Sequence, residues 1–191
     1  MKRIGLYGGS FDPVHLGHLL VAQAAREEMT LDRIFFIPAA QSPFKPDTKP
    51  TSATERLKIL RLALAGNSHA EIDELEIKRG GVSYTIDTVR DYARRFPKAK
   101  LFYLIGADHV AQLPKWRGAE ELAKLVEFLV IPRPGQAKIE IPAPFSGEFL
   151  SGFPLGVSSS QIRARTKAGS PIEHLVPSAV AEAIRNNGLY L

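Results

Sequence analysis

The sequence predicts an α/β protein with a Rossmann-like parallel sheet, helices on both faces of that sheet, and a small C-terminal helical region. Three observations lead to this fold class. Apolar, strand-like runs alternate with segments of helical period along the chain. The run from Arg33 to Pro38 is almost wholly apolar, as in a strand covered on both faces. The chain has 191 residues, enough for one domain but not for two, so we expect a single domain over residues 1–191.

In the first half of the chain, local signals mark where each helix begins. Asp12 is expected to be an N-cap with Pro13 at the first helical position. Ser52 to Glu55 has the capping-box pattern. A turn is expected at Gly80 and Gly81. The expected elements are a strand ending at Tyr7, a helix to about Met29, a strand from Arg33 to Pro38, a helix through Ala65, and one or two strands around Ile72 to Lys78.

In the second half, short strands and helices again alternate. The stretch from Pro132 to Pro154 is rich in proline and glycine and is expected to be a long loop or an edge segment. Gly188 is expected to end the last helix. The expected elements are helices at Tyr84 to Phe96, Ala119 to Leu125, Ser159 to Ala168 and Ser178 to Asn187, and strands at Lys100 to Ile105 and Val126 to Ile131.

Composition excludes several classes of protein. There is no cysteine, so disulfides, thiolate metal sites and cysteine nucleophiles are excluded. No apolar run is long enough to span a membrane and no secretory signal is evident, so we expect a cytoplasmic protein without a membrane partner. The net charge of +5 is spread along the chain without a basic block, so nucleic acid is not the expected partner. The sequence leaves open whether the protein is a homo-oligomer.

The segment from Gly8 to His18 lies between the first strand and the first helix. Gly8 and Gly9 allow backbone N–H groups to approach a phosphate, and the helix N-terminus behind them adds positive potential. His15 and His18 share one face of the first helical turn, where two imidazoles can stabilise a pentacoordinate phosphorus. Gly17 keeps that face open. The segment therefore predicts a phosphate site.

Alternatives to this interpretation are a zinc site or a purely structural pair of histidines. Two histidines at this spacing can ligate zinc, but no third ligand is near in the sequence. The glycine pattern matches neither the dinucleotide fingerprint nor the P-loop. The complete segment favours phosphate chemistry, because glycines, helix terminus and histidines all suit the same ligand.

A second motif, Val157 to Arg163, is placed at another expected helix start. The Ser158 and Ser159 hydroxyls, the free N–H groups of the first turn and Arg163 one turn later can bind an anion. A helix that is merely capped by serine is the competing interpretation.

These two motifs resemble signatures of the nucleotidyltransferase superfamily, namely the HxGH motif and the ISSTxxR motif. Three further segments resemble bacterial nicotinate-nucleotide adenylyltransferases, so the resemblance covers nearly the whole chain. The SYTxxT segment lies at Ser83 to Thr88, and the GxD…W block lies at Gly106 to Trp116. The RPG segment lies at Ile131 to Gly135, and the C-terminal pattern that accompanies it lies at Leu175 to Tyr190.

The resemblance implies a role for each matching residue. His15 and His18 would bind the nucleotide phosphates, with His18 the leading catalytic residue. Asp108 would bind the ribose of the adenosine half, and capping a helix is its competing role. Trp116, in an expected proline-containing loop beyond a strand end, would stack on the pyridine ring, whereas a core tryptophan is the alternative. Residues expected to bind ATP or phosphate are Gly8, Gly9, Ser10, Phe11, Lys45, Gly106, Asp108, Ser158, Ser159 and Arg163, and those expected to bind the mononucleotide are Thr85, Trp116 and Arg133.

One departure from the family pattern concerns the loop after the second strand. The family usually shows PPHK, whereas this chain has Ser42-Pro43-Phe44-Lys45, so only Lys45 is carried over as a phosphate-bridging cation. A solvated lysine is the alternative. We find no carboxylate cage in the sequence, so we expect Mg²⁺ to arrive on the phosphates of ATP and no metal to be held by side chains.

The activity implied by the resemblance is transfer of AMP from ATP to nicotinate mononucleotide, giving deamido-NAD and diphosphate in NAD synthesis. Preference for the amide, nicotinamide mononucleotide, is one alternative. A nucleotide-binding regulator without catalysis is another, and intact His15, His18 and Arg163 argue against it.

Overall fold

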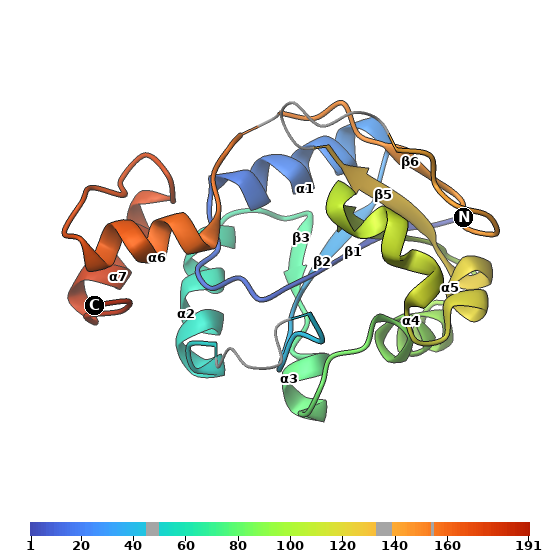
Figure 1. The fold of residues 1–191 in the computed structure, drawn as a ribbon, viewed down its shortest axis with the longest axis horizontal. Coiled ribbons are helices and arrows are strands. Elements are labelled where there is room, and N and C mark those ends of the chain that lie inside the picture. The colour runs from blue at the N-terminus through green and yellow to red at the C-terminus, as the bar shows by residue number, and fades with distance from the viewer. Residues whose placement is uncertain (45–49, 133–138, 154) are drawn as a thin grey trace.

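The computed structural model describes residues 1–44, 50–132, 139–153 and 155–191. A sheet of six parallel strands in the order β3-β2-β1-β4-β5-β6 forms its centre (Figure 1). This order places β1 and β4 side by side at the point where the direction of winding reverses, which is where open parallel sheets bind ligands. The strands are β1 Arg3–Gly9, β2 Arg33–Pro38, β3 Ala70–Ile72, β4 Lys100–Gly106, β5 Glu127–Ile131 and β6 Gly147–Phe149.

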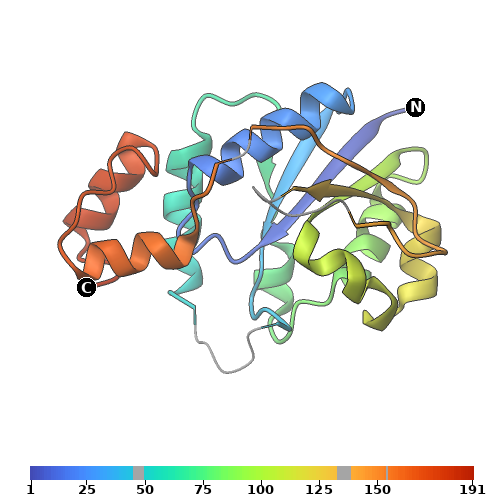
Figure 2. The same ribbon diagram turned by 45° about the horizontal axis from the view of Figure 1, so that its top comes forward.

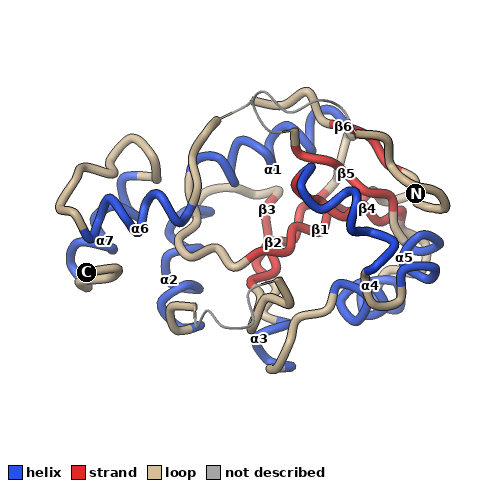
Figure 3. Tube along the Cα trace, in the orientation of Figure 1, coloured by secondary structure: helices blue, strands red, loops and turns tan. Residues whose placement is uncertain are grey.

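Helices cover both faces of the sheet, and Figure 3 separates them from the strands by colour. On β2 the side chains alternate: Phe36 packs with Ile59 on one face, while Phe35 packs with Tyr92 on the other. The expected fold class is therefore confirmed. The helices are α1 Leu16–Glu28, α2 Ala53–Leu64, α3 Leu75–Arg79, α4 Thr85–Arg95, η1 Ala107–Lys115 (a 3-10 helix), α5 Ala119–Leu125, α6 Ser159–Lys167 and α7 Ser178–Asn186.

The C-terminal helical region, α6 and α7, lies beside α2 at one end of the molecule (Figures 1 and 2). Ile162 of α6 and Ile184 of α7 are buried in the same apolar cluster as Leu60 of α2. This burial holds the region against the sheet domain and brings the start of α6 to the end of β1. Within the described ranges, no helix is long and apolar enough to cross a membrane.

The start of the first helix differs from the prediction. The helix begins at Leu16 with His15 as N-cap, so the expected N-cap at Asp12 was wrong. The Asp12 carboxylate instead accepts hydrogen bonds from the Tyr190 hydroxyl at 2.9 Å and the Thr51 N–H at 3.1 Å. A side chain that binds two distant segments cannot also cap the next helical turn.

Two further segments were assigned wrongly. Leu75–Arg79 forms the short helix α3, where a strand was expected, and only Ala70–Ile72 is a strand. The Asp73 side chain accepts a hydrogen bond from the Leu75 N–H at 3.0 Å, a turn that redirects the chain into a helix. The loop expected before Trp116 is the helix η1. The other expected helices and strands are present to within two residues, and β6 confirms an edge segment after Pro132.

Candidate active site

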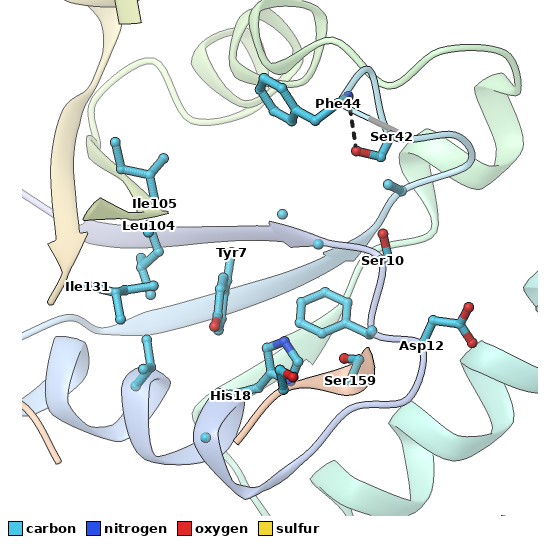
Figure 4. A pocket seen from close by; sticks show the side chains of 18 of the residues that line it. Tyr7, Ser10, Asp12, His18, Ser42, Phe44, Leu104, Ile105, Ile131 and Ser159 are labelled. Atoms are coloured by element: carbon cyan, nitrogen blue, oxygen red, sulfur yellow. Dashed lines mark hydrogen bonds between the residues drawn. The ribbon is translucent and has the colours of Figure 1, made fainter. Parts of the chain in front are cut away.

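A cavity of about 780 Å³ lies at the carboxyl ends of β1, β4 and β5. Its size suits a nucleotide-sized ligand. Figure 4 shows His18 and Phe44 on opposite sides of it, with Ser10 between them. We call the side formed by His15, His18 and Ser158–Arg163 the histidine end. We call the side formed by Phe44, Thr85, His109 and Trp116 the aromatic end.

The glycines at the end of β1 lie close to aromatic side chains. A Cβ on Gly8 would lie 2.3 Å from the hydroxyl of Tyr103, and one on Gly9 would lie 3.2 Å from the ring of Phe11. Close approach of neighbouring aromatic side chains therefore excludes a larger residue at Gly8. Both glycines line the cavity, together with Ser10 and Phe11, and phosphate binding by these four residues stays a prediction.

The two histidines form a stacked pair at the start of α1. Their ring centroids are 3.7 Å apart with an interplanar angle of 30°. The His15 backbone N–H donates to Nδ1 of His18 at 3.2 Å. Because Nδ1 of His18 is an acceptor, the proton of the neutral ring is assigned to Nε2, which is then free to donate to a ligand.

Burial keeps both imidazoles neutral in the free site. It lowers the pKa of His15, which is only 6% exposed, to about 4. Burial, and secondly the nearness of His15, lowers the pKa of the half-buried His18 well below its usual 6.5. A polyphosphate bound beside them would favour the protonated rings and raise both pKa values.

The second motif forms the N-terminus of α6. Ser158 is the N-cap, and its capping box with Gln161 is reciprocal, with bonds of 2.9 and 3.2 Å. By helix geometry, the N–H groups of Ser159 and Ser160 are left without intrahelical partners. The segment is therefore both a capped helix and part of the cavity lining, so the two interpretations of this motif are compatible.

Direct contacts join the two motifs. Ser159 Oγ donates to the Pro13 carbonyl at 2.9 Å, and Arg163 donates to the Asp12 carbonyl at 2.8 Å. A Cβ on Gly17 would lie 3.0 Å from both His15 and Val157, so glycine permits this approach of α1 to the second motif. The structure thus brings together residues that the sequence placed at opposite ends of the chain.

A buried arginine that the sequence analysis missed supports the same region. Arg56 of α2 is 1% exposed and donates to the carbonyls of Ser10, Ala39 and Thr51 at 2.7–2.9 Å. It joins the loops that follow β1 and β2 to the start of α2. One signal was available: Arg56 precedes the buried Leu60 by four residues and so lies on the same helical face.

At the aromatic end, the rings of Phe44, His109 and Trp116 contact one another, with centroids 4.6–6.2 Å apart. Trp116 is half-buried and packs edge-on against Phe128, so it is both a packing residue and part of the lining. Its indole N–H has no hydrogen-bond partner in the described part of the chain. Thr85, at the start of α4, lines the cavity with its hydroxyl 3.5 Å from that of Tyr103.

Glu76 lines the cavity and is a second residue that the sequence analysis missed. Its side chain is buried and accepts a hydrogen bond of 2.6 Å from Thr88, which in turn accepts one from Arg79. Burial raises the pKa of the Glu76 carboxyl, and the hydroxyls of Thr88 and Ser83 oppose that shift. In the sequence it stands among charged residues, in a segment for which a strand was expected.

Only some of the remaining predicted site residues are placed in the cavity lining. Gly106 lines the cavity, whereas Asp108 is exposed on the first turn of η1 and is not among the described lining residues. Its role with the ribose stays a prediction. Lys45 and Arg133 lie outside the described residues.

The expectation that Mg²⁺ arrives on the phosphates of ATP stays a prediction. Among the described residues, no group of three or more acidic or histidine side chains could hold a metal ion. The Asp12 carboxylate is already bound to Tyr190 and Thr51. Mg²⁺ carried by a polyphosphate fits such a site, because Mg²⁺ keeps several waters and needs few protein ligands.

Comparison with known proteins places the chain in a class. Residues 6–165 match the Cytidylyltransferase-like family, most of the chain. Among solved structures, the Plasmodium falciparum nicotinic acid mononucleotide adenylyltransferase complexed with NaAD superimposes with a TM-score of 0.82. It is 20% identical, and the match covers 100% of this chain and 98% of that one. The fold and the HxGH site thus define a nucleotidyltransferase of the cytidylyltransferase-like family.

Curated relatives show to which narrower family within this class the chain belongs. Nicotinate-nucleotide adenylyltransferase of Bacillus subtilis is 40% identical, over 100% of this chain and 99% of its own length. The probable nicotinate-nucleotide adenylyltransferase of Thermus thermophilus is 41% identical, over 98% and 99%. The chain therefore belongs to the nicotinate-nucleotide adenylyltransferase family.

Proposed function

We propose that this protein transfers AMP from ATP to the phosphate of nicotinate mononucleotide, forming deamido-NAD and diphosphate in NAD synthesis. The observation that carries the proposal is the junction of two phosphate-binding motifs at one cavity. His15 and His18 face the start of α6, and Arg163 and Ser159 bind the loop that leads to the histidines. The full-length relatives support the choice of substrates.

The reaction is an in-line displacement at the α-phosphorus of ATP. A phosphate oxygen of the mononucleotide forms the new P–O bond, and the bond from the α-phosphorus to the bridging oxygen breaks. Diphosphate leaves with the electron pair. The attacking phosphate is already anionic, so no strong base is needed, and catalysis is positioning and charge stabilisation.

His18 is assigned the leading role in that stabilisation. Its Nδ1 is held by the His15 N–H, so Nε2–H can donate to an oxygen of the pentacoordinate phosphorus. The first turn of α6 and Arg163 would bind the departing diphosphate. Mg²⁺ arriving with ATP would supply positive charge that neutralises the phosphates.

The aromatic end is assigned to the pyridine mononucleotide. Trp116 offers a flat ring whose face attracts the positively charged pyridinium, and Thr85 lies at the N-terminus of α4 within the same lining. Lys45 and Arg133 are proposed to contact phosphate and mononucleotide on the family resemblance alone. ATP and mononucleotides are cytoplasmic metabolites, so the cytoplasm is the proposed location.

The experiment that tests this proposal is diphosphate release from Mg-ATP with three acceptors in parallel: nicotinate mononucleotide, nicotinamide mononucleotide and phosphopantetheine. We expect the highest kcat/KM with nicotinate mononucleotide. Preference for either other acceptor would overturn the specificity while keeping the chemistry. Absence of turnover with all three, together with measurable ATP binding, would indicate a nucleotide-binding regulator.

A further inference from the structure

The loop between β1 and α1 contains a residue in an unfavourable backbone conformation. Phe11 has φ of +47°, in the left-handed region that non-glycine residues seldom adopt. Its ring is 1% exposed and lies edge-on to Tyr7 and His18, with centroids 5.5 and 5.1 Å apart. A strained residue persists only where its surroundings over-determine it, and here it directly contacts the proposed catalytic ring.

Hydrogen bonds from distant segments hold the loop on both sides of Phe11. Arg56 binds the carbonyl of Ser10, and Arg163 binds that of Asp12. The partners come from α2 and α6, 46 and 151 residues away in the sequence. The loop conformation therefore depends on tertiary contacts more than on its own sequence.

The Asp12 side chain is the third anchor, and it binds the end of the chain. It is 7% exposed, and Figure 4 shows its carboxylate pointing away from His18. Tyr190, the penultimate residue, donates to its Oδ1 at 2.9 Å, while the Thr51 N–H donates to Oδ2. Tyr190 also has a positive φ, +67°. One hydrogen bond thus joins two segments that each contain a strained residue.

We propose that Tyr190 is a positioning residue for adenylyl transfer, acting through Asp12 to hold the loop that orients His15 and His18. The hydroxyl contacts no reacting atom. Together with the Thr51 N–H, it fixes the Asp12 carboxylate, and it ties the last residues of the chain to the loop between β1 and α1. This inference rests on the proposed function.

The test is Tyr190→Phe, which removes one hydroxyl and keeps the ring. We expect kcat per folded molecule to fall about tenfold, with KM for ATP within about twofold, because misoriented donors weaken transition-state binding more than ground-state binding. Tyr92→Phe is the matched control. Its hydroxyl also donates to a carboxylate, Asp73 at 2.7 Å, on the α4 face and outside the cavity lining. We expect a comparable fall in Tm and an unchanged kcat for this control.

A double-mutant cycle shows whether the hydroxyl acts through Asp12. Asp12→Ala and Tyr190→Phe should together lower kcat little more than Asp12→Ala does alone, since both changes remove the same bond. Losses that multiply would overturn the proposal, as would a Tyr190→Phe kcat within twofold of the parent. Parent protein without turnover would overturn the proposed function itself, a result that is distinct from both.

Discussion

At the histidine end of the cavity, segments from opposite ends of the chain are joined by directional hydrogen bonds, whereas the aromatic end is lined by rings in tilted and edge-on contacts. Arg163 and Ser159 reach the loop before α1, and Arg56 binds it from behind. The rings of Phe44 and Trp116 are in tilted contact. Charge that develops in a transition state needs fixed dipoles, while a flat aromatic ligand needs only complementary shape.

This difference predicts distinct consequences of mutation. Changes at the histidine end should lower kcat or the free energy of unfolding, because the bonds there orient donors and satisfy buried groups. Changes at the aromatic end should raise KM for the acceptor. The following experiments test the division, beginning with the largest effect.

His18→Ala should lower kcat by about 10² to 10³-fold and change KM for ATP little, because it removes a donor to the pentacoordinate phosphorus. Steady-state rates of diphosphate release measure both constants. His174→Ala, at an exposed histidine outside the cavity lining, is the control. A rate within about threefold of the parent would remove His18 from the mechanism.

Arg56→Met should lower the free energy of unfolding by about 3 kcal/mol, because three carbonyls, one of them buried, lose a charged donor. Urea denaturation measures the change. Arg61→Met on the same helix removes a largely exposed ion pair with Glu74 and should cost less than about 1 kcal/mol. Equal costs for the two variants would show that Arg56 does not hold the histidine end together.

Acidification should destabilise the free protein through His15. Its pKa is lowered from 6.5 in the unfolded chain to about 4 in the fold, so the unfolded state binds the extra proton first. The contribution of neutral His15 is complete above pH 6.5 and is lost as the pH falls to about 4, with a maximum near 3 kcal/mol. Urea denaturation of the parent and of His15→Gln gives the free energy of unfolding at each pH. Between pH 4 and 6.5 this free energy should fall more steeply on acidification in the parent than in the variant, and outside that range the two should change alike. The same pH dependence in both proteins throughout would contradict the lowered pKa of His15.

Trp116→Ala should raise KM for nicotinate mononucleotide about tenfold, equal to about 1.4 kcal/mol, and leave KM for ATP unchanged. Trp116→Phe keeps an aromatic face and should recover most of the affinity. If KM for the mononucleotide does not change, Trp116 serves only to pack against Phe128, and the aromatic end has no share in binding the acceptor.

Much of the fold could be predicted because its signals are local. Ser52 caps α2 through the Glu55 N–H, as its sequence pattern indicated, and the continuous apolar run predicted that β2 is covered on both faces. The prediction failed at Asp12, where the local rule for an N-cap competed with two tertiary hydrogen bonds and lost. It failed again at Leu75, where one turn side chain redirected the chain from the expected strand into a helix.

The sequence by itself determined the α/β class, the two phosphate motifs and the family, because periodicity and short motifs are properties of neighbouring residues. Only the tertiary structure decided that Arg56, Asp12 and Tyr190 support the histidine end. Their partners lie up to 178 residues away. A buried polar group must find a hydrogen-bond partner wherever the fold brings one close, and no local pattern records which partner that will be.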